Sequence, residues 1–203
     1  MDTLNVLVIE NRPGAGDAAV DELVRGGHHI ERCHEPGDHA FPCKGLVDPE
    51  SCPIHRVDVA LSVRHHVTPR PTRLEEGVTC ALRAGIAVVE DGPDILDPFE
   101  PWLSGRVEGA VATSCERAIE QSLRPLKDRL MAVTVPIARD AGVEPEAISW
   151  SVERSPGRVA LRARGPALDV RTRSRLAVRA LDALRGSPCR RDQVDVDYEI
   201  ATD

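Results

Sequence analysis

The first strand of the chain is predicted at Leu4-Asn5-Val6-Leu7-Val8-Ile9, and a turn follows it at Glu10-Asn11-Arg12-Pro13-Gly14-Ala15-Gly16. A continuous apolar run that ends in a Pro/Gly turn is typical of a strand buried on both faces. The residues from Asp17 to Val24 then favour a short helix, which Gly26-Gly27 would end. A buried strand followed directly by a helix is the repeating unit of a parallel sheet.

The same alternation continues through the first half of the chain. Further strands are predicted over 28–33, 57–63 and 86–89, and a second helix is predicted to begin at Thr72 and to stop at Gly85. Strands and helices in alternation predict an α/β domain with a parallel sheet over residues 1–92.

Two of these strands carry a family resemblance. Val6-Leu7-Val8-Ile9-Glu10-Asn11-Arg12-Pro13 and Asp58-Val59-Ala60-Leu61-Ser62-Val63-Arg64 resemble the first and third strands of response-regulator receiver domains. The resemblance covers roughly residues 4–92 and implies a receiver-like, flavodoxin-like or Rossmann-like sheet. In that family an acidic pair holds magnesium where this chain has Glu10 and Asn11, and the phospho-accepting aspartate aligns with Ser62. Without a carboxylate nucleophile, the resemblance implies the scaffold but not its phosphoryl chemistry.

The second half has a different pattern. A proline-rich linker is predicted at 93–106, followed by a helical segment and a smaller α+β domain, in the order helix-β-β-α-β, over 107–203. The helical segment has apolar residues at heptad spacing, which are Ile119, Leu123, Leu126, Leu130, Val133 and Ile137. Pro125 and Pro136 predict kinks or a break there. The seam indicates either a helix packed on its own domain or a homodimer contact.

The richest chemistry lies in a predicted long loop, residues 33–56, which holds three of the six cysteines and three of the seven histidines. Its four prolines disfavour a crossover helix, and a loop of this length is usually functional or internally tied down. Zinc prefers four Cys or His ligands, so we predict a metal site from five candidate residues, which are Cys33, Cys43, Cys52, His55 and His34. An iron–sulfur cluster is less favoured, because the close cysteine spacings are missing. Two alternatives to a metal site stay open. The thiols could be redox-active or form a disulfide, or they could be small buried side chains without chemistry.

The remaining cysteines and the ends of the predicted strands complete the set of candidate residues. Cys80, Cys115 and Cys189 stand alone in the sequence, so we interpret them as core or surface filler. Open parallel sheets bind ligands beyond the carboxyl ends of their strands. Those ends are predicted at Glu10-Asn11, Cys33-His34, Arg64-His65-His66 and Glu90-Asp91, all at one edge of the sheet.

Charge and hydropathy limit the partners. Residues 1–110 hold 10 basic and 19 acidic residues, whereas residues 111–203 hold 16 and 14. An acidic first half argues against nucleic acid there, because binding a polyanion needs Lys and Arg to neutralise phosphates. The arginines between Arg158 and Arg191 lack interleaved aromatic residues, so RNA recognition is poorly supported. No stretch approaches the roughly 18 apolar residues of a membrane span, and no signal peptide is evident, so we expect a cytoplasmic location and no membrane partner.

These observations favour a regulatory or sensory protein without catalytic activity. It would combine a Cys/His metal- or redox-sensing site with a C-terminal domain that binds a protein partner or forms a homodimer. The alternative is a metal- or thiol-dependent enzyme that acts on a small molecule at the edge of the sheet, with Glu90 or Asp91 as general base. The sequence does not decide whether the chain is an enzyme.

Overall fold

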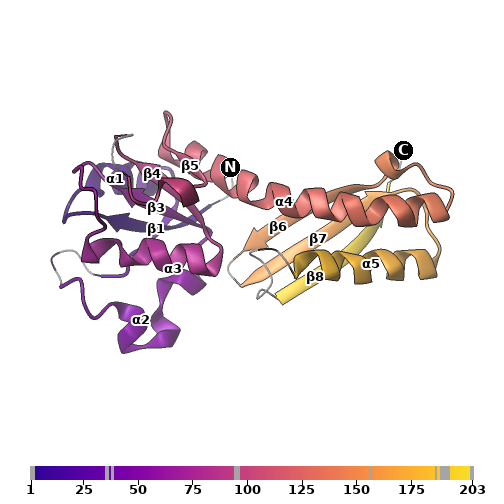
Figure 1. Cartoon of the computed structure of the whole chain (residues 1–203), viewed down its shortest axis with the longest axis horizontal. Helices are drawn as coiled ribbons and strands as arrows, with labels where there is room; N and C mark the ends of the chain where they lie inside the picture. The colour runs from indigo at the N-terminus through magenta and orange to yellow at the C-terminus, as the bar shows by residue number, and fades with distance from the viewer. Residues whose placement is uncertain are drawn as a thin grey trace. The chain divides into compact units, whose positions relative to one another are not determined.

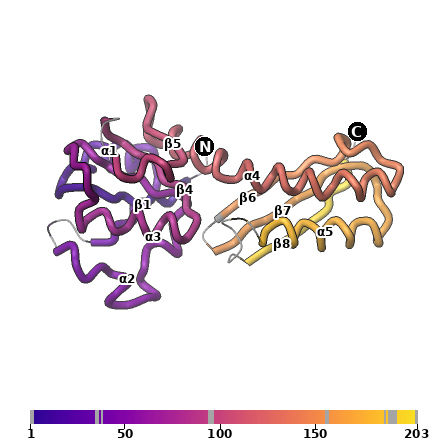
Figure 2. Tube along the Cα trace, viewed as in Figure 1, coloured from indigo at the N-terminus to yellow at the C-terminus, as the bar shows by residue number. Residues whose placement is uncertain are grey.

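The computed structural model describes residues 3–34, 37, 39–93, 97–155, 157–185, 187 and 193–201. The chain divides into two compact units, Met1–Ser122 and Leu123–Asp203, and each has a sheet of its own (Figures 1 and 2). The division falls within a helix, downstream of the proline-rich segment 93–106. Cys189 lies outside the described residues.

The first unit is built on a five-stranded sheet in which every strand is parallel to its neighbours. The strands are β1 (Asn5–Glu10), β2 (His29–Glu31), β3 (Val59–Val63), β4 (Ala87–Asp91) and β5 (Gly105–Arg106), in the order β2-β1-β3-β4-β5. The predicted α/β class with a parallel sheet is therefore confirmed. This strand order is compatible with a flavodoxin-like or Rossmann-like domain.

Helices cover both faces of this sheet, which explains why its central strands β1, β3 and β4 are mostly apolar. The helices are α1 (Asp17–Arg25), α2 (Lys44–Val47), α3 (Glu76–Ala84) and α4 (Val111–Asp140). Val6 and Val8 belong to the core beneath α1 and the start of α4, whereas Leu7 and Ile9 belong to the core beneath α3. The period-2 alternation of a strand therefore sends neighbouring side chains of β1 to opposite cores.

The start and stop of α3 follow from local chemistry. Thr72 and Glu75 form a capping box ahead of the helix, around a single 3₁₀ turn at Arg73–Glu75. Gly85 ends the helix with φ +68°, a left-handed conformation that glycine adopts without steric cost. Both signals were expected from the sequence.

The proline-rich segment contributes to the first unit. Phe99 is buried in the core beneath α3. The two residues of β5 pair with Val89 and Glu90 of β4 and extend the sheet by one strand. The sequence predicted no strand here.

The described part of the Cys/His loop, residues 33–34, 37 and 39–56, contains no crossover helix, as its prolines led us to expect. It has one turn of α-helix, α2, and two 3₁₀ turns at Pro49–Ser51 and Pro53–His55. Each of these 3₁₀ turns begins at a proline, the position where a missing N–H has no cost.

The predicted break in the long helical segment is wrong. α4 is one helix of 30 residues with Pro125 and Pro136 inside it, and both prolines are exposed. Leu126, Leu130 and Ile137 of the heptad seam are buried within the chain itself. Much of the seam therefore contributes to the protein's own cores.

The second unit contains the rest of α4, a three-stranded sheet and one more helix. These elements are β6 (Ser149–Ser155), β7 (Arg158–Gly165), α5 (Val170–Leu184) and β8 (Gln193–Ile200). β7 lies in the middle of the sheet, antiparallel to β6 and parallel to β8. Asp169 caps α5, because its Oδ1 accepts a hydrogen bond from the backbone N–H of Thr172 at 3.0 Å.

Candidate functional site

The carboxyl ends of the parallel strands meet at one edge of the first sheet. Ser62 of β3 is in register with Glu90 of β4, which is in register with Arg106 of β5. Ala60 and Val88 belong to the core beneath α3. Because side chains alternate along a strand, Ser62, and Glu90 beside it, face α3 as well.

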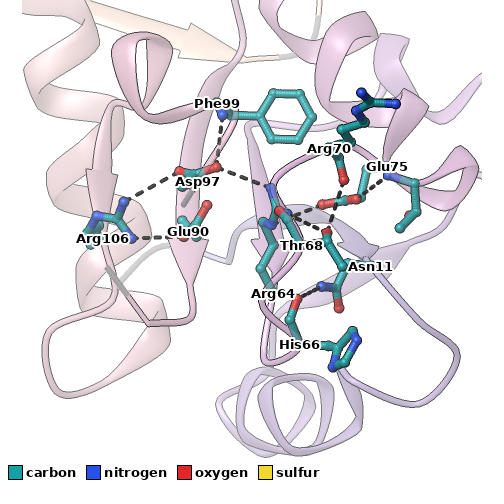
Figure 3. A network of polar contacts seen from close by, with 11 residues as sticks. Asn11, Arg64, His66, Thr68, Arg70, Glu75, Glu90, Asp97, Phe99 and Arg106 are labelled. Atoms are coloured by element: carbon teal, nitrogen blue, oxygen red, sulfur yellow. Dashed lines mark hydrogen bonds and ion pairs between the residues drawn. The ribbon is translucent and has the colours of Figure 1, made fainter. Parts of the chain in front are cut away.

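A buried network of charged side chains occupies this edge (Figure 3). Arg106 Nη1 donates to Glu90 Oε1 at 2.8 Å, and Arg106 Nη2 lies 3.4 Å from Asp97 Oδ2. Arg64 Nη1 donates to the other Asp97 oxygen at 3.2 Å, and Arg64 Nε lies 3.2 Å from Glu75 Oε1. Arg64 is only 4% exposed and Glu75 is 0% exposed. The network therefore joins three carboxyl groups through two guanidinium groups, and of its five side chains only Arg106, at 24% exposed, has substantial contact with water.

Arg64 also contacts the loops that follow β3 and β4. Its Nη2 donates to the backbone oxygen of Thr68 at 2.8 Å and to Thr68 Oγ1 at 3.0 Å. Its guanidinium carbon lies 5.7 Å from the centre of the Phe99 ring, a cation–π distance. Asn11 Nδ2 donates to the backbone oxygen of His66, which ties the same loop to β1. The network thus fixes the loops after β3 and β4 against the edge of the sheet.

Glu90 has an unusual pKa within this network. Burial, together with the neighbouring Asp97 carboxylate, raises the pKa of Glu90 to about 8, against the opposing effect of Arg106. The side chain is 1% exposed, and Oε2 has no hydrogen-bond partner within the described part of the chain. A substrate could reach Glu90 only if the network opened, so this structure does not present Glu90 as an accessible general base.

The residues at the receiver-like positions have structural contacts. Glu10 Oε2 accepts a hydrogen bond from the backbone N–H of Gly16 at 3.1 Å, and Arg32 Nη1 lies 3.5 Å from Glu10 Oε1. Ser62, which aligns with the phospho-acceptor, is 0% exposed. A phosphoryl donor has no access to Ser62 in this structure.

The cysteines of the predicted metal site lie near one another. The backbone N–H of Lys44 donates to the oxygen of Cys33 at 3.1 Å, which places Cys43 beside Cys33. Cys52 lies against α2, because a Cβ built on Gly45 would be 2.8 Å from Cys52 Sγ. The segment from Cys43 to Cys52 therefore folds back on the end of β2.

A fourth thiol, Cys80 of α3, belongs to the same region. A Cβ built on Gly77 would be 3.1 Å from Cys33 Sγ, and Cys80 follows Gly77 by three residues, on the same side of the helix. Burial raises the pKa of the Cys33 thiol to about 12, and the charges of Cys43, Cys52 and Cys80 add to this effect. Our interpretation of Cys80 as filler did not foresee that Cys80 lies near the cysteines of the loop. Only the fold brings α3 to the end of β2.

The remaining predicted ligands are placed differently. His34 and Cys33 line an open pocket of about 220 Å³ together with His39 and Lys44. His55 is exposed, and its described contact is a backbone hydrogen bond from its N–H to the oxygen of Cys52 at 3.3 Å. Within the described ranges, no three Cys, His, Asp or Glu side chains are arranged so that they could hold a metal ion. The metal set stays a prediction.

Comparison with known proteins adds no assignment. No protein-family model matches the chain, and no curated protein matches its sequence. None of the helices described is long and apolar enough to cross a membrane.

Proposed function

We propose that the chain is a regulatory protein without catalytic activity, whose first unit senses a thiophilic metal ion, with zinc as the first candidate. The observation that carries this proposal is the gathering of four thiols beside α3. Cys33, Cys43, Cys52 and Cys80 come from four separate elements or turns.

The chemistry of these groups supports a soft metal ion. Thiolates are preferred ligands of zinc, and four of them complete a tetrahedral structural site. Cys33 and Cys52 each lie against a glycine, Gly77 and Gly45, where a larger residue would displace the sulfur atom. Metal binding would draw the segment 43–52 toward Cys33 and Cys80, and this change in the loop would be the signal.

The test is elemental analysis of protein purified without a metal-binding tag, combined with a count of free thiols. We expect about one zinc ion per chain, as a closed four-thiolate site holds a single ion. Cys33→Ser, Cys43→Ser, Cys52→Ser and Cys80→Ser should each lose the metal. Cys115→Ala is the matched control, because Cys115 is buried in the core beneath α1, away from the cluster. It should keep the metal.

Two results would overturn the metal proposal. The first is absence of metal with all six cysteines free, even after incubation with zinc. The second is absence of metal with only four free thiols, which would make the cluster a disulfide switch instead.

The second unit supplies the partner-binding half of the proposal. β8 is an edge strand of its sheet, and an edge strand is a template for pairing with another chain. Three acidic residues, Asp195, Asp197 and Glu199, alternate on one face of β8. Two copies paired through β8 would bring like charges together, so we favour a different protein with a basic strand over a homodimer. Light scattering should therefore give a monomer mass, and a dimer that dissociates in Val196→Pro would contradict this choice.

A further inference from the structure

The covered face of the second sheet holds two of the chain's few aromatic residues. Trp150 of β6, Ala163 of β7 and Tyr198 of β8 are in register, so they form one row across the sheet. α5 lies over this row, with Arg173 and Ala177 toward it. Between helix and sheet lies a cavity of about 350 Å³ that is open to solvent on one side. This volume lies within the range of small-molecule sites.

The polar ends of both aromatic residues are already bonded. Trp150 Nε1 donates to Thr134 Oγ1 at 2.8 Å, and the Tyr198 hydroxyl donates to the backbone oxygen of Pro166 at 2.7 Å. These bonds fix the two rings, which pack in part against the core of the second unit and in part line the cavity. Ala163 and Ala177 are small, which leaves room between the rings and the helix.

Arg173 is the charged group of this cavity. Two other arginines of α5 already form ion pairs: Arg175 with Asp140 at 2.9 Å, and Arg179 with Asp182 at 3.5 Å. Arg173 forms no ion pair with any described residue, and its Nε is buried without a hydrogen-bond partner. Burial raises the pKa of Tyr198, and the nearby positive charge of Arg173 opposes this rise. Arg173 and Tyr198 both line the cavity.

One carboxylate lies among the lining residues, but it belongs to the opposite face. Asp197 precedes Tyr198 in β8, and consecutive side chains of a strand point to opposite sides of a sheet. The cavity is therefore apolar and aromatic on its sheet side, and on its helix side it carries a positive charge that no described carboxylate neutralises.

We propose that this cavity binds a small organic anion with a flat, apolar body, such as an aromatic carboxylate. The rings of Trp150 and Tyr198 would contact the apolar body, and Arg173 would pair with the anionic group. This site lies entirely within the second unit and does not depend on the thiol cluster. Ligand binding there would give the second unit a signal that is separate from metal binding in the first unit.

Trp150 fluorescence provides the test. The chain has only two tryptophans, so Trp102→Phe leaves Trp150 as the sole reporter. Phenylacetate should change the Trp150 emission in a saturable way, with a dissociation constant of about 1 mM or lower at low salt. Phenylacetamide, its neutral analogue, should bind at least about tenfold more weakly, because it cannot pair with the guanidinium.

Three variants in this background decide the assignment. Arg173→Gln should weaken phenylacetate binding by about tenfold or more and leave phenylacetamide binding unchanged. Arg171→Gln removes the same charge from an exposed position outside the cavity, so it should bind as the parent does. Ala177→Leu fills the cavity without changing the charge and should abolish binding of both compounds.

The proposal is overturned if phenylacetate gives no saturable change up to about 10 mM, which corresponds to negligible affinity. Equal weakening by Arg173→Gln and Arg171→Gln would also overturn it, since that result would mean attraction by general surface charge. Binding that survives Ala177→Leu would place the ligand elsewhere. Circular dichroism of each variant confirms that the second unit is folded, and none of these outcomes depends on the metal content of the first unit.

Discussion

Arg64 and Glu75 form an ion pair inside the first unit, with 3.2 Å between Arg64 Nε and Glu75 Oε1. Arg64 follows the end of β3, and Glu75 lies directly before α3. The pair therefore fixes the position of the helix that carries Gly77 and Cys80, beside the end of β2. The charged network and the thiol cluster are connected through this helix.

Glu75→Gln should destabilise the protein strongly. The substitution removes one of the two carboxylates that neutralise the buried Arg64 charge and leaves only Asp97, which Arg106 also contacts. Breaking a buried ion pair costs about 3–5 kcal/mol in the free energy of unfolding, and the remaining Asp97 contact sets this range as the upper limit. Glu75 also accepts a hydrogen bond from the Thr72 N–H at 2.6 Å, and glutamine can keep that bond. Urea denaturation followed by circular dichroism gives the comparison.

Glu76→Gln is the matched control, because Glu76 is adjacent and exposed. Its effect should stay within about 0.5 kcal/mol. Similar losses in the two variants would mean that the buried ion pair does not stabilise the fold.

Glu90 should make stability depend on pH. In the folded protein Glu90 holds its proton up to about pH 8, whereas in the unfolded chain it loses that proton near its ordinary pKa of 4.5. The folded state therefore binds more protons in this interval, and the free energy of unfolding should fall as the pH rises from about 4.5 to about 8. The contribution is fully present below the lower value and is lost above the upper one.

Glu90→Gln tests this assignment, because glutamine has no proton to lose and can still accept a bond from Arg106. Chemical denaturation at a series of pH values should show a flatter profile for the variant, with its largest advantage over the parent above pH 8. An unchanged profile would assign the pH dependence to other groups.

Gly77→Ala should disturb the thiol cluster. The added Cβ would lie 3.1 Å from Cys33 Sγ and 3.2 Å from Ile9, so these atoms must move. Overpacking of this kind costs about 1–3 kcal/mol, and the bound metal we propose should be lost or held more weakly. Thermal unfolding and zinc content are the measurements.

Gly105→Ala is the corresponding control in β5, where the nearest atom to an added Cβ is Ala118 Cβ at 3.9 Å. It should keep the metal content of the parent. Loss of metal in both variants would show that the effect is not local to Cys33.

Pro125→Ala should stabilise α4. Pro125 is exposed inside the helix, where it lacks the N–H of an i→i−4 hydrogen bond, so alanine should raise the free energy of unfolding by up to about 3 kcal/mol. Pro49→Ala is the control, because Pro49 begins a 3₁₀ turn and is favourable there. A higher melting temperature only for Pro125→Ala is expected, and a lower one would show that the proline is needed where it stands.

The sequence predicted those parts of the fold that depend on neighbouring residues. The apolar runs of β1 and β3 and the stop of α3 at Gly85 each involve residues a few positions apart. Periodicity and capping preferences act at this range, so one sequence is sufficient to find them. The parallel α/β class followed from the order of these elements.

Pairing and burial across long separations were beyond such patterns. β5 has two residues, which is too few to show any periodicity in the sequence. It forms only because it pairs with β4. α4 stays continuous through Pro125 because apolar residues on its other side, such as Leu126 and Leu130, are buried. Tertiary packing outweighed the local preference of proline in this helix.

The composition and spacing of the chain thus determined that a parallel sheet forms, where β3 ends, and that a Cys/His loop follows β2. Only the tertiary structure decided that Cys80 joins that loop and that Arg64 meets Glu75 and Asp97. It also decided that Arg173 shares a cavity with Trp150 and Tyr198. The physical reason is that helix hydrogen bonds and helix caps join residues close in sequence, whereas contacts between distant side chains depend on how sheet and helices pack.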